Sequence, residues 1–276
     1  MNIDEFDYKE PCCPLSDGKD FYYPREVRQH ESIPVDRIIS RLDEYFSHND
    51  LTSAEALLDY WLKEAVDLSD YRGELSVLNE FTGLYRKTGN KEKSEKINGR
   101  IFDLLNILDL KNTVSGATIL LNVATNKKAF GDPQGAIELY LEAADIYASS
   151  LKPDDPLFGG LYNNFALALA DTGDFEKAYD YFDKALSIVR KNKNLPDCAV
   201  TYCNIAVTKL LENPLNDEES DNALDDALKR LDDPDVVKDG YYAFVCDKCA
   251  AAFGECGRFT DAADLKERAR KIYERN

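Results

Sequence analysis

The chain has 276 residues and a formal net charge of −18, because 52 acidic residues outnumber 34 basic ones. Its hydrophobic content of 44% is ample for a core, but no apolar run approaches the ~20 residues that span a bilayer. Nucleic acid and anionic membrane surfaces would repel this charge, so we expect neither as a partner. The acidic start MNIDEFDYKE lacks an apolar signal segment, and we therefore expect a cytoplasmic protein.

Residues 1–33 predict an irregular N-terminal segment rather than a helix or a strand. They contain Pro11, Pro14 and Pro24, which interrupt regular structure. They also carry several aromatic residues, a load that is unusual for a disordered tail. The segment could lie in a groove of its own, but we expect it to pack along the helices that follow.

Residues 34–276 predict one domain of paired helices. Apolar residues recur at steps of three and four, which is typical of amphipathic helices, and turn residues separate the two helices of each pair. No strand-like alternation stands out. The predicted pairs are 35–47 with 53–68, 71–87 with 91–108, 113–129 with 133–149, 156–171 with 175–191, 196–211 with 217–231, and 236–255 with 260–274.

A period of 42 residues relates these pairs to one another. Glycines of the predicted turns follow it, with one doubled interval: Gly89, Gly131, Gly173 and Gly257. Alanines at one place in the second helices follow it too: Ala143, Ala185, Ala227 and Ala269. A small residue at a fixed place indicates that two helices cross closely there. A fixed period of this length indicates a stacked array of repeats.

The best-formed pair, residues 161–189, resembles the tetratricopeptide repeat (TPR). The residues that carry the likeness are Tyr162, Phe165, Ala166 and Leu169 in the first helix, and Ala178, Phe182 and Ala185 in the second. The 42-residue period and the Asn-Phe-Ala run at 164–166 resemble the kinesin-light-chain subtype. The resemblance covers roughly four-fifths of the chain. It implies an all-α fold, an α-α superhelix of about six helix-turn-helix repeats with a concave peptide-binding face.

The same resemblance implies a row of groove residues on the first helices. In that family, the residue two before the small packing residue points into the groove, and here that row is Glu80, Asn122, Asn164, Asn204 and Lys248. Amides offer donors and an acceptor to a peptide backbone, and the lysines could receive negative charge. The asparagines could instead bond to the backbone of the next repeat, and both roles can hold together. The expected peptide-binding residues are Asn79, Asn122, Thr125, Lys128, Asn163, Asn164, Asn204 and Lys248.

The seven cysteines invite a metal or redox interpretation, above all Cys246 and Cys249. By register, however, these two align with Tyr162 and Phe165, which are core positions, so we expect buried, reduced and metal-free thiols. Only two histidines occur, and no nucleophile motif or phosphate loop is present. We therefore expect no cofactor, no metal, no catalytic residue and no enzyme activity.

Two functions remain as hypotheses. The first is a non-enzymatic adaptor or scaffold that binds a protein or an extended peptide segment. The second is a bacterial regulatory sensor of a small peptide that lacks its own DNA-binding domain. Sensors built on similar repeats usually carry an N-terminal helix-turn-helix, and residues 1–33 are too rich in proline for one, which favours the adaptor.

Overall fold

The computed structural model describes residues 32–215 and 217–274, and over these residues it consists of twelve α-helices without a strand. This confirms the predicted all-α fold of paired helices. The chain divides into two compact units, with the boundary after Ser150. Residues 1–31 of the predicted N-terminal segment lie outside the described residues. Within the described ranges, every helix is too short or too polar to span a bilayer.

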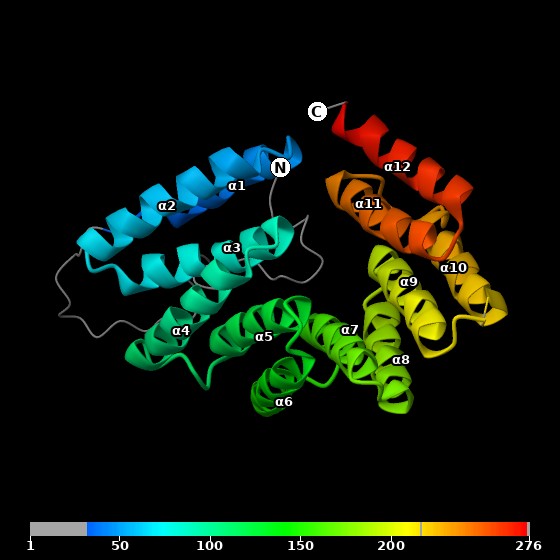
Figure 1. Cartoon of the computed structure of the whole chain (residues 1–276), viewed down its shortest axis with the longest axis horizontal. Coiled ribbons are helices and arrows are strands. Elements are labelled where there is room, and N and C mark those ends of the chain that lie inside the picture. Colours follow the sequence, from blue (N-terminus) through cyan, green and yellow to red (C-terminus); the bar gives the residue numbers. More distant parts are fainter. Residues whose placement is uncertain (1–31, 216, 275–276) are drawn as a thin grey trace. The chain divides into compact units, whose positions relative to one another are not determined.

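The first unit contains three helix pairs (Figure 1). They are α1 (Val35–Ser47) with α2 (Leu51–Asp67), α3 (Tyr71–Thr88) with α4 (Lys91–Ile107), and α5 (Val114–Ala129) with α6 (Pro133–Ser150). The first helices of the second and third pairs lie deepest. Every residue from Gly73 to Asn79 in α3 and from Gly116 to Ala124 in α5 is buried, because α3 packs against α1, α2, α4 and α5.

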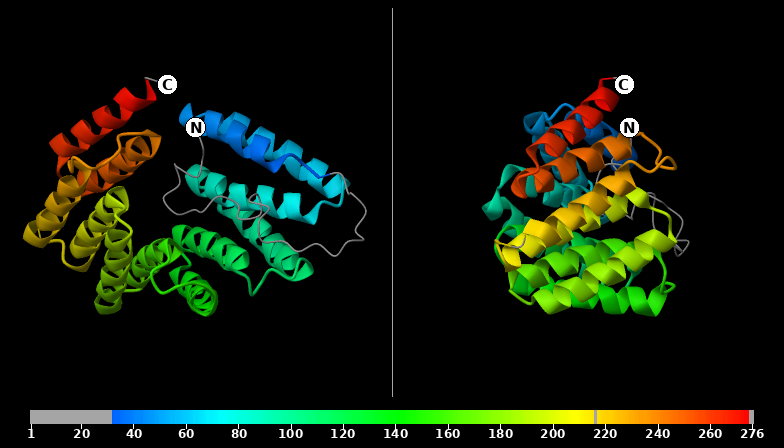
Figure 2. Two further views of the ribbon diagram at one scale, coloured as in Figure 1. Left: turned by 180° about the vertical axis from the view of Figure 1, so that it is seen from behind. Right: turned by 90° about the vertical axis from the view of Figure 1, so that its right-hand side faces the viewer.

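The second unit also contains three pairs, each an antiparallel hairpin (Figure 2). They are α7 (Pro156–Asp171) with α8 (Phe175–Lys191), α9 (Leu195–Glu212) with α10 (Asp217–Leu231), and α11 (Gly240–Glu255) with α12 (Phe259–Tyr273). One buried cluster runs from Leu186 in α8 through α9, α10 and α11 to Ala269 in α12. Each hairpin therefore buries its apolar face only together with the next one.

Side-chain caps explain where most helices begin. The carboxylates of Asp50, Asp70 and Asp174 accept hydrogen bonds from backbone N–H groups of the first turns of α2, α3 and α8. Asp239 does the same for α11, where its Oδ1 accepts from the backbone N–H of Tyr242 at 3.0 Å. This cap corrects the prediction that the helix starts at residue 236, because the chain enters α11 only at Gly240.

Lys127 and Lys209 occupy positions that the repeat pattern reserves for apolar residues, so the sequence predicts that these core positions are either frayed or only partly buried. Both lie partly buried and are ion-paired. Lys127 Nζ lies 2.6 Å from Asp132 Oδ2, and Lys209 Nζ lies 2.8 Å from Glu219 Oε2. Each long side chain can bury its methylene groups while its charged end reaches a carboxylate.

Many of the turns contain one residue in the left-handed conformation. Within the hairpins, left-handed glycines such as Gly173, at φ 82°, reverse the chain. Three other residues with φ between 54° and 55° lie where one hairpin leads to the next: Ser69, Asp109 and Lys193. Asn49, between α1 and α2, shares that conformation. A side chain at such a φ is strained, and glycine avoids this strain.

Two glycine-to-alanine changes with opposite expected signs test the role of the turn. A Cβ added at Gly173 or at Gly99, in the middle of α4, meets no atom within 4 Å, so the two sites differ in backbone conformation rather than in space. Gly173→Ala should lower the free energy of unfolding by about 1 kcal/mol because φ is positive. Gly99→Ala should raise it by about 0.5–1 kcal/mol. Chemical denaturation measures both; shifts in the same direction would contradict the assignment.

Candidate functional site

The first helices of the second unit, α7, α9 and α11, lie side by side and are joined by polar pairs on one face. Asn204 Nδ2 in α9 donates to Asn163 Oδ1 in α7 at 3.0 Å. Seven residues earlier in α9, Asp197 Oδ1 accepts a hydrogen bond from the Tyr241 hydroxyl of α11. Residues seven apart lie on one face, two turns from each other, so both pairs belong to a single stripe. We call this stripe the first-helix face.

Lys248 continues the first-helix face on α11. It follows Tyr241 by seven residues, as Asn204 follows Asp197, which places it level with Asn204. Its side chain is exposed, and its ammonium lies 6.0 Å from the centre of the Phe244 ring. The Tyr241 and Phe244 rings stack with their centres 6.4 Å apart. The face therefore offers an amide, two aromatic rings and a cation.

A buried carboxylate orients this face. Asp197 is only 1% exposed, and its Oδ2 accepts from Asn194 Nδ2 at 2.6 Å while its Oδ1 accepts from Tyr241. A buried carboxylate is stable only when its oxygens are hydrogen-bonded, so Asp197 fixes the position of the Tyr241 ring. The sequence interpretation missed both residues. A local signal was present, because Asn194 and Asp197 have the spacing of a reciprocal cap at a helix start.

The first unit uses its amides in a similar way. Asn122 Nδ2 in α5 donates to Asn79 Oδ1 in α3 at 3.0 Å, and both side chains are buried. Asn126 Nδ2 in α5 donates to Ser94 Oγ in α4 at 2.6 Å. These bonds join α5 to the preceding hairpin. The asparagines thus do join two repeats, but through side chains of the preceding repeat rather than through the backbone of the next one.

The structure brings the expected peptide-binding residues together in part. Asn79 pairs with Asn122, and Asn204 pairs with Asn163 rather than with Asn164, its expected neighbour in the row. Thr125 Oγ1 lies 3.0 Å from the Tyr140 hydroxyl. By exposure the set divides into three groups: Asn79, Asn122 and Asn163 are buried, Thr125, Lys128, Asn164 and Asn204 are half-buried, and Lys248 is exposed.

The described cysteines lie in the second unit, and four are buried: Cys198, Cys203, Cys246 and Cys249. Burial raises the pKa of the Cys246 thiol to about 12. The pKa of Cys203 is also raised, first by its hydrogen bond with Cys249 and then by burial. In the part of the chain that the structure describes, no three His, Cys, Asp or Glu residues gather as metal ligands. The thiols at 246 and 249 are thus core residues, as their register predicts.

The raised pKa makes a prediction about thiol reactivity. A thiol whose pKa is about 12 holds almost no thiolate at pH 8, and the thiolate is the species that reacts. We expect iodoacetamide to label Cys246 about a hundredfold more slowly in the folded chain than in urea. Cys249, which is 1% exposed, should be protected by its burial. Peptide mapping by mass spectrometry gives both rates. Equal rates in the two states would show that these thiols are open to solvent.

The asparagine pair of the first unit predicts a loss of stability. Asn122→Ala leaves Asn79 Oδ1 buried without the hydrogen bond from Asn122, which should cost about 1–3 kcal/mol of the free energy of unfolding. Asn164→Ala, at a half-buried amide on α7, should change it by no more than about 0.5 kcal/mol. Urea denaturation compares the two variants. An equal loss for both would contradict the structural role of the buried pair.

Comparison with known proteins supports the fold that these contacts build. The family model described as tetratricopeptide repeat matches residues 158–231. A putative kinesin light chain from Podosopora anserina with nearly identical TPR-like repeats is 17% identical; the match covers 72% of this chain and 94% of that one, with a TM-score of 0.50. A variant of that protein with one substitution is also 17% identical. The match covers 72% of this chain and 93% of the variant, with a TM-score of 0.51.

A third solved structure, BtubC (BKLC) from P. vanneervenii, is 19% identical. The match covers 87% of this chain and 91% of that one, with a TM-score of 0.48. No curated protein matches the chain. The TPR fold is typical of non-catalytic scaffolds that bind proteins or peptides. The family match assigns tetratricopeptide repeats to residues 158–231, and the Podosopora anserina structures show that the chain shares the fold of kinesin-light-chain-like repeats.

Proposed function

We propose that the chain is a non-enzymatic scaffold that binds an extended protein or peptide segment on its first helices. The observation that carries the proposal is the first-helix face of the second unit. There a half-buried amide, two aromatic rings and an exposed lysine lie on helices that partly buried polar pairs hold in register.

Asn204 is suited to a peptide backbone. Its hydrogen bond to Asn163 uses one of the two N–H groups of the amide and fixes the orientation of the side chain. The second N–H and the carbonyl oxygen are then available to one peptide group of a ligand, which needs both an acceptor and a donor. Asn164, half-buried on α7, extends this polar surface by one helix.

Lys248, Tyr241 and Phe244 define the chemistry of the ligand. The two rings offer apolar surface to a side chain, and the lysine ammonium attracts a carboxylate. The chain has a net charge of −18, so a cation beside half-buried aromatic rings favours an acidic side chain or a terminal carboxylate at this place. Thr125 and Lys128 on α5 would give the first unit a comparable surface.

Asn79, Asn122 and Asn163 act as positioning residues in this proposal. They are buried and bonded between consecutive first helices, so they set the spacing of the side chains that meet the ligand. Fixed spacing lowers the entropy cost of binding an extended segment, because the surface does not have to become ordered first.

A double substitution tests the proposed surface. The labelled chain is applied to an array of unstructured peptides that end in a free carboxylate or in an amide, and the peptides it retains are titrated in solution. Asn204→Ala with Lys248→Ala should weaken their binding about a hundredfold, at roughly 1–2 kcal/mol for each lost contact. Peptides with an acidic residue or a free carboxylate should bind best.

The control changes the same residue types on a second helix. Asn222 and Lys229 are exposed on α10, and Asn222→Ala with Lys229→Ala should leave peptide affinity unchanged. Circular dichroism checks that both variants are folded. An Asn204/Lys248 double variant that is folded and binds as tightly as the parent would show that the ligand lies elsewhere.

A further inference from the structure

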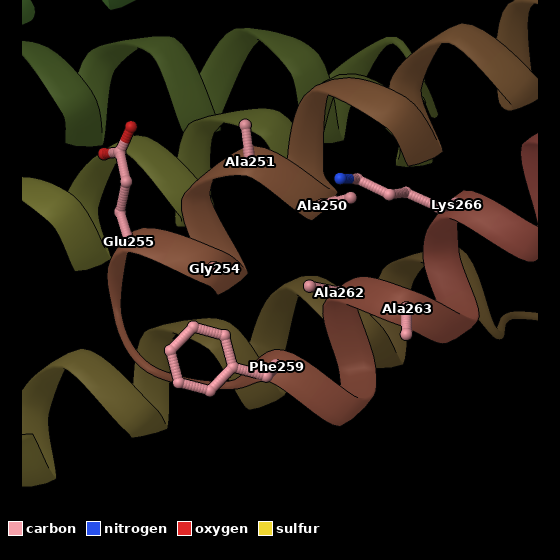
Figure 3. Close-up of a pocket in the computed structure, with 8 residues that line it drawn as sticks. All are labelled: Ala250, Ala251, Gly254, Glu255, Phe259, Ala262, Ala263 and Lys266. Carbon is pink, nitrogen blue, oxygen red and sulfur yellow. The ribbon is translucent and has the colours of Figure 1, made fainter.

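An open groove of about 510 Å³ lies between α11 and α12 (Figure 3). Its walls consist mainly of small residues, and the Phe259 side chain at its edge is 73% exposed. All its lining residues belong to these two helices: Ala250, Ala251, Gly254, Glu255, Phe259, Ala262, Ala263 and Lys266. Glu255 follows Lys248 by seven residues, so the groove adjoins the first-helix face on α11.

The same place on other hairpins is covered by a helix. Tyr179 of α8 stands two 42-residue periods before Ala263, and there α9 covers the face. The Tyr179 hydroxyl donates to Glu212 Oε2 at 2.7 Å, and Lys209 Nζ lies 3.9 Å from the ring centre. The groove therefore occupies the position in the repeat that, in α8, packs against a neighbouring helix.

The first unit shows the same arrangement. Ser94 of α4 stands four periods before Ala262, and Asn126 of α5 donates to its hydroxyl at 2.6 Å. Covering an apolar surface at this place in the repeat lowers the free energy, because water is released from the small side chains and from the exposed ring.

Three features make the groove complementary to itself. Phe259 is a protruding ring beside a wall of small residues, so one copy can supply the ring and the other the space. Glu255 and Lys266 carry opposite charges, and Figure 3 shows them at opposite ends of the groove. A two-fold rotation would place Glu255 of one copy opposite the partner subunit's Lys266.

We propose that a second copy of this chain covers the groove, in a two-fold symmetric dimer through the α11–α12 faces. A head-to-tail contact through α1 fits the groove poorly, because the exposed side of α1 carries charged residues, among them Asp36, Arg37 and Arg41. The symmetric contact uses one surface twice and closes after two copies.

Sedimentation equilibrium of the full chain tests the dimer. The parent should dimerise, and Phe259→Asp should weaken dimerisation by about tenfold or more, since the contact would then bury a carboxylate in place of the ring. Val237→Asp is the matched control, because Val237 is 72% exposed in the same unit and lies outside the groove. It should dimerise like the parent.

Charge reversal tests the two-fold geometry. Glu255→Lys alone and Lys266→Glu alone should each weaken the dimer by repulsion, and the double variant should restore it because opposite charges face each other again. Ala251→Arg should block the groove without touching the core. A monomeric parent would leave the groove to another segment of the chain or to a different protein, and it would overturn the proposal. So would a dimer that Phe259→Asp leaves intact, or one that the double charge swap fails to restore.

Discussion

Every feature of this protein depends on one constraint: a helical hairpin of this kind cannot bury its apolar face without its neighbour. The alanines at the crossing points show how tightly the two helices of a hairpin meet, since Ala143, Ala185 and Ala227 are fully buried. A larger side chain there would separate the helices and open the core. The fixed period of the sequence follows from this packing, because each hairpin must present the same face to the next.

The same constraint places polar groups where they can serve recognition. Stacked first helices bring side chains that lie more than forty residues apart into direct contact, as with Asn79 and Asn122 or Asp197 and Tyr241. Buried polar pairs contribute little net stability, but they penalise any shift of one helix along another. The contacts that hold neighbouring first helices in register therefore also position the side chains of a binding surface.

The sequence predicts the helices well and the contacts between them less well. Periodicity and turn residues place α1, α7, α8 and α10 at their observed bounds, since each carries a strong local signal. The apolar residues Val236 and Val237 gave a false helix start, because periodicity does not detect the cap at Asp239. Asn122 bonds to Asn79 and Asn204 bonds to Asn163, and a 42-residue period does not specify which of two adjacent residues meets the neighbouring helix. The Asp197–Tyr241 contact joins two helices, and a local pattern does not encode it.

The dependence of each hairpin on the next has a consequence for how such a chain can change in length. Gly173 inside α7–α8 and Lys193 between α8 and α9 are both left-handed, so the turns themselves do not distinguish the two kinds of connection. A gain or loss of one helix would expose a face that is buried in the stacked array. A gain or loss of a whole 42-residue hairpin keeps that face covered. Length should therefore vary among related chains in whole-hairpin steps, with each breakpoint in a turn between hairpins.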